Sequence, residues 1–207
     1  VEELKTWMKD NKISVGINID EDTKRYYPYN NLASSVIGFC GADNQGLSGI
    51  EAKWDNVLKG TPGKIVSYKA SGSDITLTID IYIQSTIEKY LKQAVEKYDC
   101  ANGGNVIVMD PKTGNILGMA NYPDYNLNTP YTPNSVLAKT YDSLSDEEKN
   151  EALYRMWANK SVSDSYEPGS TFKIITSSVA LEENITTPNK PNDFYCQGYE
   201  VVEDRTI

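Results

Sequence analysis

The chain has 207 residues, of which 39% are hydrophobic and 24% are charged, which is enough for one large or two small folded domains. Its formal net charge is −9, and its lysines are scattered. This argues against nucleic-acid binding, because affinity for nucleic acid comes mainly from neutralising phosphates. The absence of histidine excludes Ser-His-Asp and Cys-His catalysis and removes the commonest transition-metal ligand.

The three cysteines, Cys40, Cys100 and Cys196, are far apart and odd in number. Because no Cys-x-x-Cys pair occurs, isolated thiols are expected rather than a zinc site or a disulfide framework. The sequence has no signal peptide and no apolar run long enough to span a bilayer. If the parent protein is membrane-anchored, the anchor is expected before residue 1.

The first sixty residues predict helices and one strand. Apolar spacing predicts a helix over residues 1–10 and a short helix over 32–39, and alternation over 13–19 predicts a strand. Ser48 and Glu51 have the spacing of a capping box, which predicts that Glu51 caps the helix that follows.

A domain boundary is expected where regular patterning stops. Gly60 ends the helix, and residues 64–74 form a loosely patterned connection. We therefore expect a first domain over residues 1–66 and a second over residues 67–207.

The sequence of the second domain predicts a helix packed on a hairpin. Residues 74–80 alternate like a strand, and Asp80 can cap a helix over about 81–98. Two short apolar strands, 105–109 and 116–120, are joined by a Pro- and Gly-containing turn. This order of elements indicates an α+β fold. The predicted apolar face of the helix comprises Ile83, Ile87, Tyr90, Leu91, Ala94, Val95 and Tyr98.

Further helices follow an ordered loop at about 122–136. Ser145 and Glu148 form a second capping-box pattern, which predicts a helix to about Trp157. A Pro-Gly break precedes a helix predicted over about 170–182, and a hairpin is expected near 194–207.

Ser170 and Lys173 form the single Ser-x-x-Lys sequence of the chain. On a helix, residues three apart share a face with Cβ atoms roughly 5–6 Å apart, so this lysine can reach the serine hydroxyl. A serine needs a base to become a nucleophile, and no histidine competes for that role. The lysine would act as that base if burial or a neighbouring cation lowered its pKa from about 10.4. The bland alternative is that Ser170 only begins a helix, since serine is a good N-cap.

Several stretches resemble one family, in order along the chain. They are Ala33–Gly60 with Gly46–Glu51 at its centre, Ile75–Gln84, Val108–Ala120, Tyr122–Tyr125 with Asn128, Asn159–Asp164, and Tyr166–Lys173. Together they are similar to class B penicillin-binding proteins. Their motif sequences most resemble those of the members that act in division or sporulation. The resemblance implies the end of an N-terminal pedestal domain, followed by the first part of a transpeptidase domain.

The resemblance implies an extracytoplasmic, membrane-anchored D,D-transpeptidase that cross-links peptidoglycan without a cofactor or a metal ion. Ser170 would be the nucleophile and one oxyanion donor through its N–H, and Lys173 would be the base. Tyr166, Glu167 and Thr171 are candidate substrate-binding residues, although the first two would also serve to orient the turn. The implied partners are peptidoglycan stem peptides, β-lactam antibiotics and cell-wall or divisome proteins, and no nucleic acid.

Two motifs that complete the site in this family, Ser-x-Asn and Lys-[Ser/Thr]-Gly, do not follow Lys173. Lys112-Thr113-Gly114 has the right letters but precedes Ser170, so it is interpreted as a structural turn. The chain is therefore expected to be incomplete and inactive by itself.

Three alternatives remain. One is a class D β-lactamase or β-lactam sensor domain, which shares Ser-x-x-Lys but would have no pedestal-like segment. Another is a non-catalytic scaffold of a cell-wall complex. The third is a metal site at Cys196 and Asp193, for which one thiol and one carboxylate are too few ligands.

Overall fold

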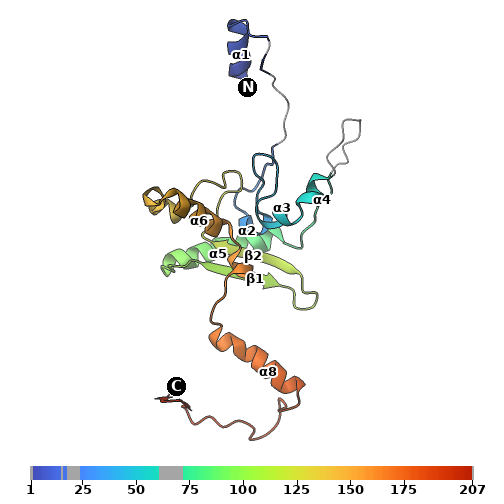
Figure 1. The fold of residues 1–207 in the computed structure, drawn as a ribbon. Helices are drawn as coiled ribbons and strands as arrows, with labels where there is room; N and C mark the ends of the chain where they lie inside the picture. Colours follow the sequence, from blue (N-terminus) through green and yellow to red (C-terminus); the bar gives the residue numbers. More distant parts are fainter. Residues whose placement is uncertain (1, 15, 18–23, 61–71, 207) are drawn as a thin grey trace. The chain divides into compact units, whose positions relative to one another are not determined.

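The computed structural model contains two compact units, residues 1–164 and residues 165–207 (Figure 1). The residues it describes are 2–14, 16–17, 24–60 and 72–206. The expected boundary between residues 66 and 67 lies outside the described residues.

The first unit mixes short helices with one hairpin. Its α-helices are α1 (Glu2–Asp10), α2 (Ser34–Ile37), α3 (Gly49–Lys53), α4 (Asp55–Lys59), α5 (Ile81–Lys97), α6 (Asp146–Trp157) and α7 (Lys160–Ser163). Its strands are β1 (Gly104–Met109) and β2 (Ile116–Tyr122), and two 3₁₀ turns are η1 (Leu137–Lys139) and η2 (Tyr141–Ser143).

Helix α5 packs along the β1–β2 hairpin, as predicted (Figure 1). The Asp80 side chain accepts hydrogen bonds from the N–H groups of Tyr82 and Ile83, which confirms it as the N-cap. The two strands are antiparallel, with Gly104 opposite Tyr122. The cluster between helix and hairpin consists of Leu91, Ala120 and Tyr122, flanked by Ile87, Val95 and Val106.

The buried residue Gln84 was not singled out from the sequence, yet it joins α5 to β2. Its Oε1 accepts from Met119 N–H at 2.8 Å, and its Nε2 donates to the Met119 carbonyl at 2.9 Å. The side-chain amide thus pairs with the strand as a neighbouring backbone would. The same Nε2 donates to Glu88, which also accepts from Ala33 N–H at 2.7 Å. Burial raises the pKa of Glu88.

A second cluster joins the first sixty residues to the chain after β2. It is built on Phe39, which is fully buried and meets Trp157 edge-on with ring centroids 4.9 Å apart. Trp157 is therefore a packing residue. The buried members of the cluster are Tyr27, Phe39, Tyr125 and Leu127, with Ile37, Met156 and Trp157 against them.

Some sequence predictions are wrong. Residues 74–80 form no strand; instead Thr78 Oγ1 and Asp80 N–H bond the carbonyls of Ile116 and Leu117. Tyr90, Ala94 and Tyr98 were predicted to lie on the apolar face of α5 but are exposed. The hydroxyl groups of the two tyrosines tolerate contact with water, and alanine has little apolar surface to bury. The strand predicted over 13–19 falls partly outside the described residues, and residues 13, 14, 16 and 17 are not extended into one.

The capping box predicted at Ser48 does not form. Ser48 precedes α3 but makes no side-chain cap, and its hydroxyl lies 3.4 Å from the Tyr125 hydroxyl. Glu51 is buried and turns to Arg25, whose Nε donates to it at 2.6 Å. The Cys40 thiol donates to the same carboxylate at 3.3 Å. A buried carboxylate needs such partners, and they take Glu51 away from the helix start.

The second unit is small and mostly exposed. Its elements are η3 (Gly169–Phe172), α8 (Lys173–Glu182), and the two-residue strands β3 (Val201–Val202) and β4 (Arg205–Thr206), which form a hairpin. The predicted helix and hairpin of this region are therefore confirmed. Large apolar side chains of α8 lie exposed, including Ile174 at 71% and Ile175 at 54%. No helix among residues 2–14, 16–17, 24–60 and 72–206 has the length and apolarity to cross a bilayer.

Candidate functional site

Ser170 lies in a 3₁₀ turn rather than at the start of an α-helix. Gly169 enters the turn at φ 53°, a left-handed conformation that glycine adopts without a Cβ penalty. The α-helix begins at Lys173, whose backbone N–H reaches the carbonyls of Ser170 and Thr171. The Ser170 N-cap suggested by the sequence is thus wrong. The spacing argument survives, because side chains at positions i and i+3 eclipse in a 3₁₀ helix.

The turn is held by its own residues. The Thr171 hydroxyl donates to the Pro168 carbonyl at 2.5 Å, and Thr171 N–H donates to the same oxygen at 3.2 Å. Thr171 therefore closes the turn. Among the residues described in this unit, neither Tyr166 nor Glu167 contributes a hydrogen bond to it, and Tyr166 is 78% exposed. Both Ser170 and Lys173 are exposed.

The chain enters this segment from α7, a one-turn helix that the sequence patterns did not predict. The Asn159 side chain caps it by accepting from Ser161 N–H at 3.2 Å. An asparagine followed two residues later by a small polar residue was the available signal, since asparagine is a favoured N-cap. Lys160 Nζ donates to the Asn102 carbonyl at 3.2 Å, which fastens α7 to the turn that precedes β1.

The Lys112-Thr113-Gly114 sequence forms the tip of the β1–β2 hairpin, as interpreted. Asp110 accepts from Lys112 N–H at 2.9 Å and from the Thr113 hydroxyl at 2.8 Å. These hydrogen bonds, the first from Lys112, lower the pKa of Asp110. Both residues that precede the glycine are therefore used to close the turn.

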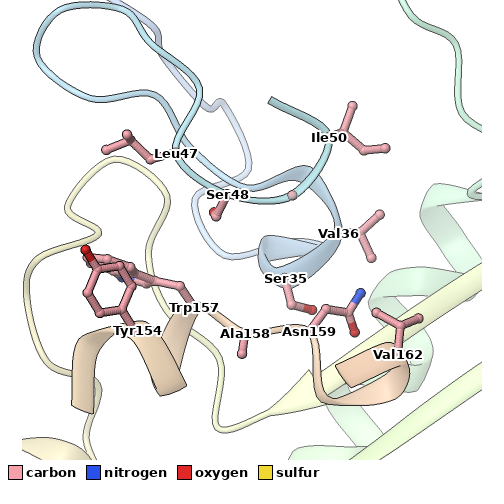
Figure 2. A pocket seen from close by; sticks show the side chains of 11 residues that line it. Ser35, Val36, Leu47, Ser48, Ile50, Tyr154, Trp157, Ala158, Asn159 and Val162 are labelled. Atoms are coloured by element: carbon pink, nitrogen blue, oxygen red, sulfur yellow. The ribbon is translucent and has the colours of Figure 1, made fainter. Parts of the chain in front are cut away.

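An open pocket of about 490 Å³ lies in the first unit, between the segment 35–50 and the residues of α6 and α7 (Figure 2). Tyr154 and Trp157 form one wall, and Ser35 and Asn159 face each other at its floor. Its lining contains neither Ser170 nor Lys173.

Asp193 is bound to neighbours other than Cys196. Lys190 Nζ lies 2.6 Å from its carboxylate, and the Thr186 hydroxyl also donates to it. The hydrogen bonds from Lys190 and Thr186 lower the pKa of Asp193. Cys40, Cys100 and Cys196 are free thiols. In the part of the chain that the structure describes, no three metal-ligating side chains gather.

Two models of known protein families together match almost the whole chain. Residues 1–89 match the penicillin-binding protein dimerisation domain, and residues 104–206 match the penicillin-binding protein transpeptidase domain. The chain belongs to the class B penicillin-binding proteins. The α+β fold and the order of a pedestal-type domain before a transpeptidase domain agree with this assignment.

Relatives of this penicillin-binding protein include the stage V sporulation protein D of Bacillus subtilis, 36% identical over 91% of the chain. The peptidoglycan D,D-transpeptidase FtsI of Escherichia coli is 28% identical over 84% of it. The chain spans 29% of the length of each relative. Among solved structures, penicillin-binding protein 3 of Mycobacterium tuberculosis in complex with aztreonam has a TM-score of 0.64. It is 28% identical, over 89% of this chain and 36% of that one.

Proposed function

We propose that this chain is the part of a peptidoglycan D,D-transpeptidase that carries the acyl-accepting serine, Ser170, and its base, Lys173. The observation that carries the proposal is the Ser-x-x-Lys sequence on a 3₁₀ turn that leads into α8, within the residues matching the transpeptidase domain. A dimerisation-domain match over residues 1–89 favours this function over a free-standing β-lactamase.

In the proposed reaction, Ser170 Oγ attacks the carbonyl carbon between the two D-Ala residues of a stem peptide, and Lys173 Nζ takes the hydroxyl proton. The C–N bond breaks, and the departing D-Ala amine receives that proton. An amine of a neighbouring stem then attacks the acyl-serine, forms the cross-link and restores the Ser170 hydroxyl. A β-lactam acylates the same oxygen by opening its ring, so the leaving nitrogen stays attached.

The remaining features of the function are also proposals. The first domain, residues 1–66, would serve as a pedestal and contact cell-wall or divisome proteins, and residues 67–207 would belong to the transpeptidase domain. The protein would act on the extracytoplasmic face of the cell membrane. Tyr166, Glu167 and Thr171 would border the bound stem peptide.

The test is intact-mass spectrometry after incubation with a fluorescent penicillin, on the full-length gene product that carries this chain. One adduct per chain is expected, and it is lost in Ser170→Ala. Ser178→Ala is the matched control, because Ser178 lies on α8 and its hydroxyl only donates to the Ile174 carbonyl. An adduct that persists in Ser170→Ala, or a folded protein that takes no adduct, would overturn the proposal. Rapid loss of the adduct would indicate a β-lactamase instead.

A further inference from the structure

Four side chains meet where α2, β2 and α7 come together: Ser35, Asn121, Asn159 and Ser161, here called the Asn121 junction. Asn121 Nδ2 donates to Ser35 Oγ at 2.7 Å and to Asn159 Oδ1 at 2.9 Å. Its Oδ1 accepts from the Ser161 hydroxyl at 3.2 Å. One amide on β2 therefore bonds side chains that precede it by 86 residues and follow it by 38 and 40.

The orientation of the Asn121 amide is fixed by its neighbour. Asn159 Oδ1 already accepts from Ser161 N–H, and Asn159 Nδ2 contacts the Met119 sulfur at 3.2 Å. Turning the Asn121 amide over would bring two carbonyl oxygens together, which the partly buried junction disfavours. Asn121 therefore holds Asn159 in the rotamer that caps α7.

Helix α7 depends on such outside support. It has four residues, and helices this short are not stable without tertiary contacts. The junction fixes the first turn of α7 through Asn159, and Ser35 joins the Asn121 amide to α2. Figure 2 shows Ser35 of α2 beside Asn159 at the start of α7. Only residues 164–169 separate α7 from Ser170 along the chain.

We propose that Asn121 is a positioning residue for the proposed acyl transfer: it holds α7, from which the chain runs to Ser170, in register with α2. The inference rests on the proposed function. Asn121 would touch neither the substrate nor the reacting atoms. It acts through the Asn159 cap, so its loss lowers the rate of acylation more than it weakens penicillin binding.

Asn128 is the matched control, because it joins the same early segment to the chain after β2 without contacting α7. Its Oδ1 accepts from Tyr27 N–H at 2.9 Å, and its Nδ2 donates to the Tyr27 carbonyl at 2.8 Å. Asn121→Ala and Asn128→Ala thus each remove one side-chain amide that bonds the first forty residues to the end of the hairpin or the chain just after it. Only the first removes support from α7.

The first measurement is amide hydrogen exchange on this 207-residue chain. In Asn121→Ala, the α7 amides of Val162 and Ser163 are expected to exchange roughly tenfold faster, as for the loss of a supporting hydrogen bond. In Asn128→Ala, the Tyr27 amide should be affected and the α7 amides unchanged. Equal exchange of the α7 amides in both variants would overturn the role of Asn121.

The second measurement is the acylation of the full-length gene product by penicillin, resolved into the dissociation constant and the first-order acylation rate. Asn121→Ala is expected to lower the acylation rate roughly tenfold with a nearly unchanged dissociation constant. Asn128→Ala should keep the wild-type rate. Ser161→Ala, a milder change, should lower the rate less.

The outcomes separate this inference from the proposed function. If the wild-type protein is not acylated, the proposed function fails, and the positioning role falls with it. If it is acylated and Asn121→Ala is acylated as fast as Asn128→Ala at equal folded fraction, only the positioning role is overturned. A denaturant titration of each variant supplies the folded fraction.

Discussion

Two of the Ser-x-x-Glu sequences in the first unit, those at Ser48 and Ser145, directly precede a helix but differ in whether the capping bonds form. At Ser145, the hydroxyl accepts from Glu148 N–H, and the Glu148 carboxylate accepts from Ser145 N–H at 2.8 Å, so a full capping box starts α6. At Ser48, the serine makes no cap, and Glu51 binds Arg25 and Cys40. The motif specifies a helix start in both places, but it specifies the capping bonds only in one.

The surroundings of the two glutamates explain why only one of these sequences forms the capping bonds. Glu148 is exposed, and the N–H of Ser145 is the partner at hand. Glu51 is buried beside a guanidinium that stands 26 residues earlier in the chain. The residue after Ser48 is Gly49, with φ 58°, so the chain turns sharply where a regular first helical turn would begin. The capping bonds of a local motif therefore do not form where a distant charge binds the glutamate and a positive-φ glycine changes the backbone of the first helical turn.

The largest effect is expected from Glu51→Ala. It removes the carboxylate that bonds Arg25 Nε and leaves the half-buried Cys40 thiol without its acceptor. Because Arg25 is half exposed and can be solvated, we expect a loss of about 2–3 kcal/mol in the free energy of unfolding, measured by urea titration. The control is Glu151→Ala, which breaks an exposed pair with Arg155 and should cost below about 0.5 kcal/mol. Equal losses would show that burial of Glu51 contributes nothing.

Gly49→Ala tests the turn. An added Cβ would lie 2.6 Å from Gly38 N and from the Val36 carbonyl oxygen, on a backbone with positive φ. We expect a loss of about 2 kcal/mol, from left-handed strain and the clash together. Gly114→Ala is the control: its φ is 75° but no atom lies within 4 Å of the added Cβ. It reports the strain alone, so a loss as large as that of Gly49→Ala would argue against the clash.

Replacing the capping serine should cost more stability than replacing the serine that makes no cap. Ser145→Ala removes a working N-cap, and we expect a loss of about 1 kcal/mol in the free energy of unfolding. Ser48→Ala removes a hydroxyl that makes no cap, and the expected loss is below about 0.5 kcal/mol. Thermal or urea unfolding of both variants gives the comparison, and a larger loss at Ser48 would contradict it.

Where local signals agree with each other, the sequence was enough to predict the structure. The Asp80 cap, the part of the predicted α5 stripe that is formed by Ile87, Leu91 and Val95, and the hairpin turn at Asp110 are found as predicted, because each depends on residues within a few positions. The predictions failed where a partner lies far away in sequence. Glu51 bonds Arg25, and residues 74–80 use their polar groups on β2 without becoming a strand.

The candidate site likewise has a part that the sequence predicted and a part that it did not. The Ser170–Lys173 spacing was readable because it is local, and the 3₁₀ turn keeps the two residues one turn apart. The hydrogen bonds of the Asn121 junction could not be predicted by pattern. They join Ser35, Asn121 and Asn159, which stand far apart in the sequence and carry no periodic signal.

The smallest effect concerns pH and sharpens the comparison at the working capping box. Hydrogen bonds from the Ser145 N–H and then from its side chain lower the pKa of Glu148 below its ordinary value of 4.5. A depressed folded pKa means that this carboxylate stabilises the fold above pH 4.5, and that the contribution is lost as the pH falls through the folded pKa. Carboxyl-carbon NMR of Glu148 should therefore show a midpoint below 4.5. Ser145→Ala keeps the backbone donor but removes the hydroxyl, so the midpoint should move part of the way back. A titration midpoint that is the same in Ser145→Ala as in the wild-type chain would mean that the hydroxyl does not bind the carboxylate in solution.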